Sequence, residues 1–327
     1  MSAASPSPAA DQPMVETMTG PIKTADLGFV LMHEHIIVRS EGLAQNFLHI
    51  WDPQPALDRA LELLTALKAK GVDTLVDLTV YGLGRDIPLL LPIVEKSGMQ
   101  VIVATGLYTF YDLPHYFRFR NPDQIADLFI RDFEKGIQGT PVKPAILKCA
   151  TDAPGVTPEV EKILRAVARA HLRTGLPIST HTHAPTRRGL EQQDIFAAEG
   201  VDLGRVIIGH SGDSDDLDYL TKLLERGSYL GMDRFGIESY LPEGKRIDTI
   251  ARLCRMGWAE RMVLSHDAMA YFDAYEKEAM ALDRPNWHYF HIVDTIIPRL
   301  LEAGVTEERI DLMARETPRR IFENMGR

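Results

Sequence analysis

The stretch Gly28-Phe29-Val30-Leu31-Met32-His33-Glu34-His35 carries a short apolar run directly into two histidines. A bounded apolar run of this length is typical of a buried strand. Residues two apart in a strand face the same side, so both imidazoles are expected to point one way. Two such imidazoles at a strand end are half of a divalent-metal site, although alone they also fit a polar turn. The stretch therefore predicts a metal site only if later strands end in further ligands.

Seven further β-rich segments alternate with amphipathic helical patterns such as 56–70, 158–173, 216–226 and 246–256. Within 56–70, apolar residues recur every three or four positions, and glycines follow the helical segments where C-caps belong. Strand ends recur mostly at intervals of about thirty residues, as one βα unit requires. The segments predict an α/β fold, a single (β/α)₈ TIM barrel. The eight predicted strands are 29–35, 74–79, 100–105, 145–148, 178–181, 206–210, 228–232 and 262–265.

The barrel is expected to occupy residues 15–327, after a disordered tail at 1–14 that is rich in Ala, Ser and Pro. The tail has neither the basic region nor the continuous apolar region of a signal peptide. One irregularity is the long segment from His266 to about Trp287, which contains Tyr271, Phe272 and Tyr275. It predicts an elaborated loop after strand eight, where barrel enzymes shape their substrate pocket.

Composition limits the partners and the compartment. The formal charge of −10 argues against a nucleic-acid surface, which needs clustered cations. No run approaches the 18 apolar residues that predict a membrane span. The two cysteines, Cys149 and Cys254, are too few for a disulfide framework. We therefore expect a cytoplasmic globular protein that binds neither nucleic acid nor membranes.

Potential metal ligands close five of the predicted strands, and the C-terminal strand ends of a barrel converge on one mouth. Singly, each has an ordinary alternative: a hydrogen-bonded rim histidine, a lysine paired with a rim carboxylate, or an aspartate N-cap. Six at the same end of their strands instead predict two divalent ions with a shared ligand, as in metal-dependent hydrolases. The six residues are His33, His35, Lys148, His181, His210 and Asp267.

Lys148 is the unusual member of this set, because an ammonium group beside two dications would be repelled. Reaction of its neutral amine with carbon dioxide gives a carbamate, an anionic ligand that bridges both ions. The charges then leave the site slightly positive, which favours an electron-rich carbonyl or phosphoryl oxygen. Imidazole and carboxylate ligands suit zinc, cobalt, iron or manganese equally well.

The ordered set His33-x-His35, Lys148, His181, His210 and Asp267 resembles the phosphotriesterase branch of the amidohydrolase superfamily, and within it the phosphotriesterase-like lactonases. The resemblance extends from about residue 21 to the C-terminus. It implies that His33, His35 and Asp267 hold a buried ion, that His181 and His210 hold an exposed ion, and that carboxylated Lys148 bridges them. It also implies a homodimer. Supporting segments are 105–108 (TGLY), 112–114 (DLP), 130–140 (IRDFEKGIQGT), 189–193 (GLEQQ), 208–213 (IGHSGD), 232–234 (MDR) and 265–267 (SHD).

In that branch, the position of Tyr108 is tyrosine in lactonases and tryptophan in phosphotriesterases. A phenol can hydrogen-bond a lactone oxygen, whereas core packing is the alternative role. Arg234 resembles an arginine that supports the mouth, and an ion pair with Asp233 or Glu238 is its alternative. Met269 stands where some lactonases have cysteine, at a position that faces the pocket wall in relatives. His183 is expected outside the ligand set, and strand alternation turns Glu34 away from the barrel interior.

These features predict a hydrolase that opens lactones, foremost N-acyl homoserine lactones in quorum quenching, with weak phosphotriesterase activity. A metal-bridging hydroxide attacks the carbonyl, and Asp267 passes its proton to the departing alkoxide. Tyr108 and Arg234 complete the expected catalytic residues. The alternatives are a primary phosphotriesterase (aryldialkylphosphatase), a carboxylesterase, a non-catalytic metal-binding barrel and a non-metal barrel isomerase. A barrel isomerase would need a glycine-rich phosphate-binding turn after strands seven and eight. The sequence gives only a weak signal for such a turn, Arg234-Phe235-Gly236 after strand seven.

Overall fold

An eight-stranded parallel sheet forms the centre of the molecule in the computed structural model, which describes residues 12–108, 111–275 and 282–323. Across the sheet, the strands lie in the order in which they follow one another along the chain, from β3 to β11. The two edge strands are joined where His33 N–H donates to Ser265 Oγ (2.8 Å) and Asp267 N–H donates to the carbonyl of His33 (3.0 Å). The strands are β3 (Val30–Glu34), β5 (Thr74–Asp77), β6 (Gln100–Gly106), β7 (Ile146–Thr151), β8 (Ile178–Thr182), β9 (Val206–Ile208), β10 (Tyr229–Met232) and β11 (Met262–Leu264).

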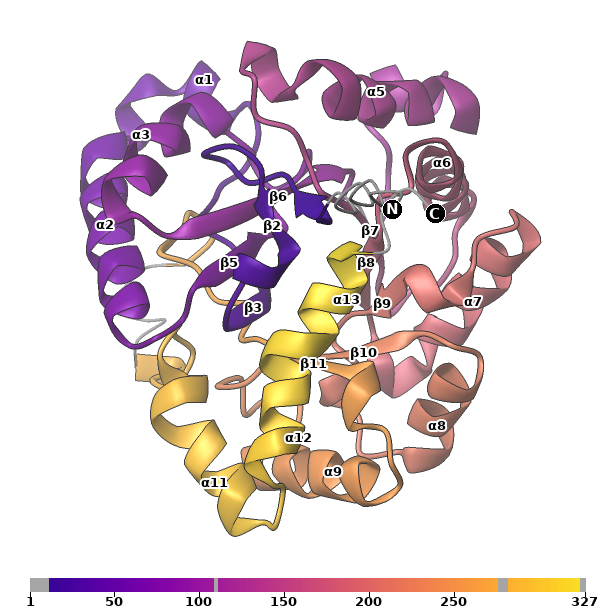
Figure 1. Cartoon of the computed structure of the whole chain (residues 1–327). Helices are drawn as coiled ribbons and strands as arrows, with labels where there is room; N and C mark the ends of the chain where they lie inside the picture. The colour runs from indigo at the N-terminus through magenta and orange to yellow at the C-terminus, as the bar shows by residue number, and fades with distance from the viewer. Residues whose placement is uncertain (1–11, 109–110, 276–281, 324–327) are drawn as a thin grey trace, which may run out of the picture.

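Helices surround this sheet and complete the predicted (β/α)₈ TIM barrel (Figure 1). All eight predicted strands are present, within a few residues of their expected bounds. Gly98 and Gly175 end their helices in the left-handed conformation, as the glycine pattern predicted. The helices are α1 (Leu43–Asn46), α2 (Pro53–Ala69), α3 (Ile87–Ser97), α4 (His115–Arg118), α5 (Pro122–Lys135), α6 (Pro158–Thr174), α7 (Arg188–Ala198), α8 (Leu217–Glu225), α9 (Glu243–Arg255), α11 (Ile297–Glu302), α12 (Glu307–Asp311) and α13 (Thr317–Glu323), with π-helical turns at Ile292–Ile296 and Leu312–Glu316.

Side-chain alternation along the strands builds two apolar layers. In β7, Ile146 belongs to the cluster inside the barrel, whereas Leu147 and Cys149 join the cluster between sheet and helices. The inner cluster is closed at the N-terminal end of the barrel by residues that include Val15 and Phe322. Polar side chains are thereby left to the opposite, C-terminal end, where the loops form the mouth.

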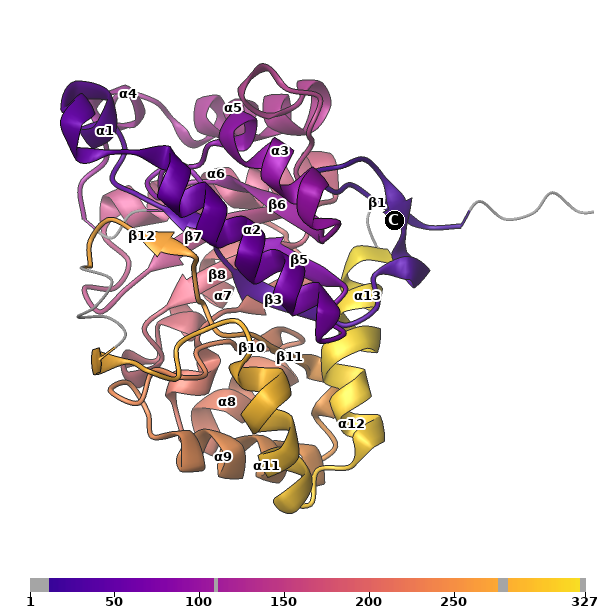
Figure 2. The ribbon, with the colours of Figure 1, turned by 90° about the vertical axis from the view of Figure 1, so that its left-hand side faces the viewer.

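Two predictions about irregular segments can be compared with the fold. Residues 1–11 of the expected tail lie outside the described residues, but Met14 is in β1 (Met14–Val15), which pairs with β2 (Ile22–Lys23). Backbone pairing therefore holds Met14, the last residue of the expected tail. The loop after β11 contains a short strand, β12 (Tyr271–Phe272), which pairs with β4 (Ile37–Val38) beside the mouth (Figure 2). No helix in the described part of the chain is long and apolar enough to cross a membrane.

Candidate functional site

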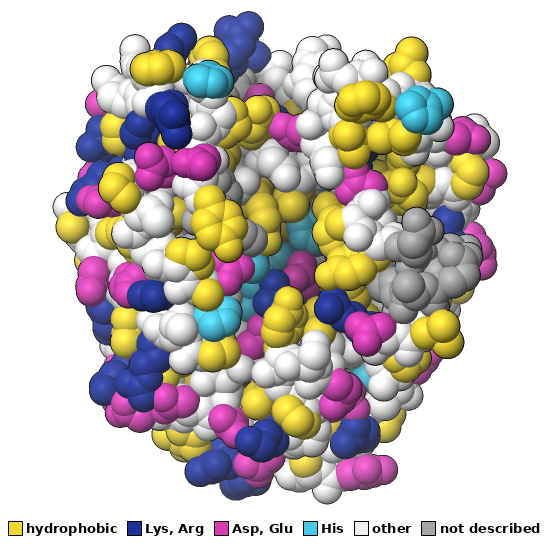
Figure 3. All heavy atoms as spheres, turned by 180° about the vertical axis from the view of Figure 1, so that it is seen from behind, with side chains coloured by type: hydrophobic (Ala, Val, Ile, Leu, Met, Phe, Trp, Pro, Cys, Tyr) yellow, Lys and Arg dark blue, Asp and Glu magenta, His cyan; other side chains and the backbone are white. Residues whose placement is uncertain are grey.

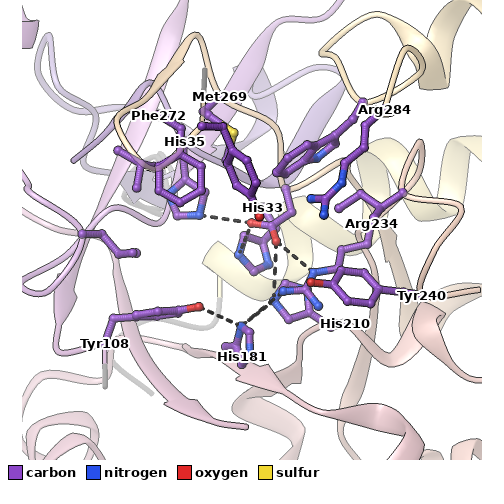
Figure 4. Close-up of a pocket in the computed structure, with 16 residues that line it drawn as sticks. His33, His35, Tyr108, His181, His210, Arg234, Tyr240, Met269, Phe272 and Arg284 are labelled. Atoms are coloured by element: carbon purple, nitrogen blue, oxygen red, sulfur yellow. Dashed lines mark hydrogen bonds and ion pairs between the residues drawn. The ribbon is translucent and has the colours of Figure 1, made fainter. Parts of the chain in front are cut away.

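A cavity of about 150 Å³ opens at the C-terminal end of the barrel. The face shown in Figure 3 is hollowed there, with histidine and acidic side chains in its depth and apolar side chains around it. Five of the six predicted ligands line this cavity, namely His33, His35, His181, His210 and Asp267. Figure 4 shows the labelled imidazoles, which come from the ends of β3, β8 and β9, converging on one point. Lys148, the sixth, is fully buried beneath them, with its Nζ 2.9 Å from His33 Nε2.

A β-bulge turns the first two histidines into the mouth. The pairing of β3 with β5 shifts between Leu31 and Glu34, so β3 has one residue more than its partner there. Val30 and Met32 both face the barrel interior, and unbroken alternation would have continued with Glu34. The extra residue reverses the alternation. His33 and His35 therefore share a direction, as predicted, but they reach the cavity only because the strand is irregular.

Outer hydrogen bonds fix three of the four imidazoles through carboxylates. Asp233 accepts from His33 Nδ1–H with one oxygen (2.7 Å) and from His210 Nδ1–H with the other (3.0 Å). Asp152 accepts from His181 Nε2–H at 3.0 Å. His35 Nδ1 lies 2.8 Å from Thr79 Oγ1. Each imidazole thus turns its other nitrogen towards the cavity, the usual arrangement around a metal-binding histidine.

Unprotonated nitrogens and carboxylate oxygens meet at close range in this inner face. His210 Nε2 lies 2.9 Å from His181 Nδ1, and Asp267 Oδ1 lies 3.2 Å from His35 Nε2 and 3.4 Å from His33 Nε2. Lone pairs facing one another repel, and a cation between them removes the repulsion. Burial lowers the pKa of His181 to about 4, so its ring is neutral and able to bind a cation near pH 7. The donor set fits divalent metal ions.

Two groups among the described residues have donor atoms close enough to hold one ion: His33, His35 and Asp267, and His33, His210 and Asp233. The first coincides with the set expected for the buried ion. In the second, Asp233 already uses both oxygens on the outer nitrogens of two histidines. We therefore assign Asp233 to orienting the imidazoles. Burial also lowers the pKa of Lys148 to about 8, which increases the fraction of neutral amine that a carbamate requires.

Asp267 is held in a strained conformation at the centre of the site. Its φ of 58° is left-handed, as is that of His210, and these are two of four non-glycine residues with positive φ in the described part of the chain. Arg234 Nε donates to Asp267 Oδ2 (3.0 Å), and Arg234 Nη1 donates to Asp213 (3.0 Å). The alternative prediction, an ion pair of Arg234 with Asp233 or Glu238, is wrong. The guanidinium of Arg234 instead points into the cavity. Although burial opposes ionisation, His33 and His210 hold the pKa of Asp267 well below its usual range.

Glu34, between the two cavity histidines, points away from the cavity as expected and organises the loop that carries Asp267. One carboxylate oxygen accepts from Ser265 Oγ–H (2.8 Å), His266 N–H (2.9 Å) and His266 Nδ1–H (2.6 Å). The other accepts from Ala268 N–H at 2.8 Å. Glu34 is fully buried. The Glu34 carboxylate thus binds the backbone N–H groups of His266 and Ala268, on either side of Asp267, and thereby stabilises the strained backbone of Asp267.

The cavity wall contains the remaining predicted residues. The Tyr108 hydroxyl lies 3.3 Å from His181 Nδ1, and its ring meets the imidazole edge-on. Met269 lines the cavity, as the resemblance implied. His183 does not, because its Nδ1 lies 2.8 Å from Thr186 Oγ1 in the next turn. The structure thus brings together every predicted site residue and leaves His183 outside.

Sequence reasoning missed the residues behind the histidines, above all Asp152, Asp213 and Asp233. Asp233 follows β10 directly and precedes Arg234. Its position at a strand end was a signal of the same kind as those of the predicted ligands. Asp152 follows β7 in the same way. Asp213, three residues after His210, carried no such signal.

Three comparisons relate this chain to known proteins. The sequence profile of the phosphotriesterase family matches residues 13–322. A phosphotriesterase homology protein of Mycobacterium tuberculosis is 52% identical, over 96% of this chain and 99% of its own length. An aryldialkylphosphatase of Saccharolobus solfataricus is 41% identical, over 92% of this chain and 96% of its own. A solved structure described as the phosphotriesterase from Mycobacterium tuberculosis superposes with a TM-score of 0.94, at 52% identity, over 96% of this chain and 99% of its own. The chain therefore belongs to the phosphotriesterase family and is a phosphotriesterase-like hydrolase.

Proposed function

We propose that this hydrolase opens lactones, foremost N-acyl homoserine lactones in quorum quenching, and hydrolyses organophosphate triesters weakly. The observation that carries the proposal is the Tyr108 hydroxyl, which lies at the cavity wall 3.3 Å from His181 Nδ1. Burial raises the pKa of this phenol, so it remains a hydrogen-bond donor throughout the working pH range. A donor beside the imidazoles suits the ring or carbonyl oxygen of a lactone.

Two divalent ions, zinc or else cobalt, iron or manganese, are part of the proposal. His33, His35 and Asp267 would hold the buried ion, His181 and His210 would hold the exposed ion, and carboxylated Lys148 would bridge them. When bound, the ions supply a Lewis acid that polarises the carbonyl or phosphoryl oxygen and activates water. The converging lone pairs of His181, His210 and Asp267 support this assignment.

The chain's own groups have distinct roles in the proposed reaction. Asp267 accepts the proton of the attacking water and returns it to the departing alkoxide. Arg234 holds Asp267 by a 3.0 Å hydrogen bond and keeps its carboxylate directed at the cavity. Tyr108 orients the substrate. On the outer side, Met269 and Phe272 offer an apolar wall to an acyl chain.

The second candidate is a primary phosphotriesterase, favoured by the name of the aryldialkylphosphatase relative at 41% identity. Relatives of 25–29% identity are named N-acetyltaurine hydrolase. Their name indicates that related proteins also hydrolyse acyl bonds, as a lactonase does. A carboxylesterase shares the lactonase chemistry. The phenol of Tyr108 favours the lactone in this proposal, because it can donate a hydrogen bond to the ring or carbonyl oxygen of that substrate.

The decisive experiment compares N-acyl homoserine lactones with paraoxon in a pH-stat, together with metal analysis of the same preparation. We expect kcat/KM for the lactones to exceed that for paraoxon, with two metal ions per chain. A Tyr108→Phe variant should lose more activity on lactone than on paraoxon. Faster triester turnover would reverse the ranking, and an active preparation with fewer than two metals per chain would exclude the binuclear mechanism.

We also propose a homodimer that acts in the cytoplasm. Support for an interface comes from large apolar side chains exposed in loops at the mouth end of the barrel, which include Phe47, Leu48 and Phe119. Both cysteines are free and buried, which suits a reducing compartment. Sedimentation of wild type and of a Leu48→Glu variant tests the assembly. A wild-type monomer at micromolar concentration would contradict it.

A further inference from the structure

Arg284 extends from the loop after β11 into the cavity that contains the imidazoles (Figure 4). Its guanidinium lies 5.1 Å from the ring centre of Trp287 and 5.3 Å from that of Tyr275. Cation–π contacts with two rings restrict the orientation of the planar group. The Arg284 side chain is only 18% exposed. The cavity therefore has a positioned cation on its outer side.

Among the described residues, arginines outnumber carboxylates in the lining of the cavity. The cavity-lining residues in the described part of the chain include two arginines and one carboxylate, Asp267. Arg234 pairs with Asp267 and with buried Asp213. Arg284 has only Asp283 as an ionic partner among the described residues, at 3.3 Å, and the side chain of Asp283 is 77% exposed. Water weakens such an exposed pair, so no described residue holds the Arg284 guanidinium in a strong ion pair.

We propose that Arg284 is a specificity-determining residue that binds a carboxylate on the part of the substrate remote from the scissile bond. The inference rests on the proposed hydrolase function and narrows its substrate class to esters or lactones whose acyl chain carries an anionic group. A guanidinium presents paired donors that match a carboxylate, and the apolar surroundings strengthen that contact. Met269 and Phe272, on the same wall, would contact the intervening methylene groups.

Two N-acyl homoserine lactones test this proposal, one with an acyl chain that ends in a carboxylate and one that ends in the primary amide of equal size. We expect wild type to prefer the carboxylate by about tenfold in kcat/KM, less at high salt. In Arg284→Gln the ratio should fall to about one, and Arg284→Lys should retain part of it. Arg252→Gln, at an exposed helical position, is the matched control and should keep the wild-type ratio. An unchanged ratio in Arg284→Gln overturns the proposal, as does a wild-type ratio of one.

A binding experiment separates this proposal from the proposed function. Calorimetry compares adipate with hexanoate, which differ only in the distal carboxylate, on wild type and on Arg284→Gln. Tighter binding of adipate to wild type that disappears in the variant supports the role of Arg284 even if neither lactone is opened, in which case only the lactonase assignment fails. If Arg284→Gln does not fold, the same comparison on Arg284→Lys and the salt dependence of adipate binding to wild type decide. Equal binding of the two acids to wild type overturns the proposal.

Discussion

The two halves of the cavity are held together by different forces. The inner ring is defined as His33, His35, His181, His210 and Asp267 and is almost fully buried. Each of its imidazoles is fixed by a hydrogen bond between its outer nitrogen and a side-chain oxygen. The outer wall is defined as Met269, Phe272, Tyr275, Arg284 and Trp287. It is partly exposed except at Trp287, and its side chains are held mainly by edge-to-face ring contacts and cation–π contacts. The Trp287 side chain has a directional anchor as well, since its Nε1–H donates to the carbonyl of His266 (3.0 Å).

The difference indicates a division of labour. Hydrogen bonds to buried groups are directional and costly to break, so the inner ring keeps one geometry, as a metal centre requires. Ring and cation–π contacts tolerate substitution and small movements, so the outer wall can change its substrate preference without disturbing the inner ring. Chemistry and specificity are thereby assigned to separable parts of one cavity.

Acidification should affect the inner ring most, because it acts on three of its imidazoles at once. Burial lowers the pKa of His181 to about 4, from 6.5 in an unfolded chain, and lowers those of His33 and His210. Between these values the unfolded state binds more protons, so the free energy of unfolding falls as the pH drops from 6.5 to 4. Urea denaturation of metal-free protein at several pH values measures this slope. His181→Asn should flatten it, whereas a slope of opposite sign in wild type would contradict the neutral ring.

Glu34→Gln should destabilise the protein by about 3 kcal/mol. Both oxygens of the Glu34 carboxylate accept hydrogen bonds, whereas the amide of glutamine would place an NH₂ donor opposite some of these donors. Urea denaturation of the metal-free variant measures the loss, with exposed Glu95→Gln as the control. The effect should come with lower metal content, since Asp267 loses its support. A variant as stable as wild type would show that the loop at 265–268 keeps its conformation without the hydrogen bonds to Glu34.

Asp233→Asn should lower kcat/KM about thirtyfold and weaken metal binding. An asparagine has one acceptor oxygen, whereas Asp233 uses two oxygens on two histidines. Assays and metal titration of the variant test the prediction, with Asp248→Asn on the exposed face of α9 as the control. Full activity in Asp233→Asn would show that the inner ring does not depend on fixed imidazole orientations, and it would contradict the contrast with the outer wall.

Met269→Leu should have the smallest effect, because the volume of the side chain is nearly conserved. We expect the ratio of kcat/KM between long-chain and short-chain lactones to change less than about fivefold, with metal content unchanged. A large loss on every substrate would mean that the wall also supports the ring.

Much of the inner ring could be predicted from the order of residues. The predicted strands are present, and His33, His35, Lys148, His181, His210 and Asp267 are assembled as expected, because parallel strands bring their C-terminal ends together. Asp152 and Asp233 also stand at strand ends, but which imidazole each carboxylate orients could not be predicted, because that depends on how side chains of different strands face one another. The pairing of Arg234 with Asp213 depended on how a loop folds after β9.

The chain's sequence by itself determined the barrel, the ends at which its polar residues gather and the kinds of ligand they offer. Local periodicity and strand order carry that information. Only the tertiary structure decided how those residues face. The bulge in β3 reverses the alternation after Met32, and the left-handed backbone of His210 and Asp267 redirects two more side chains. Both features are held by contacts with other strands, which are not present in any local stretch of sequence.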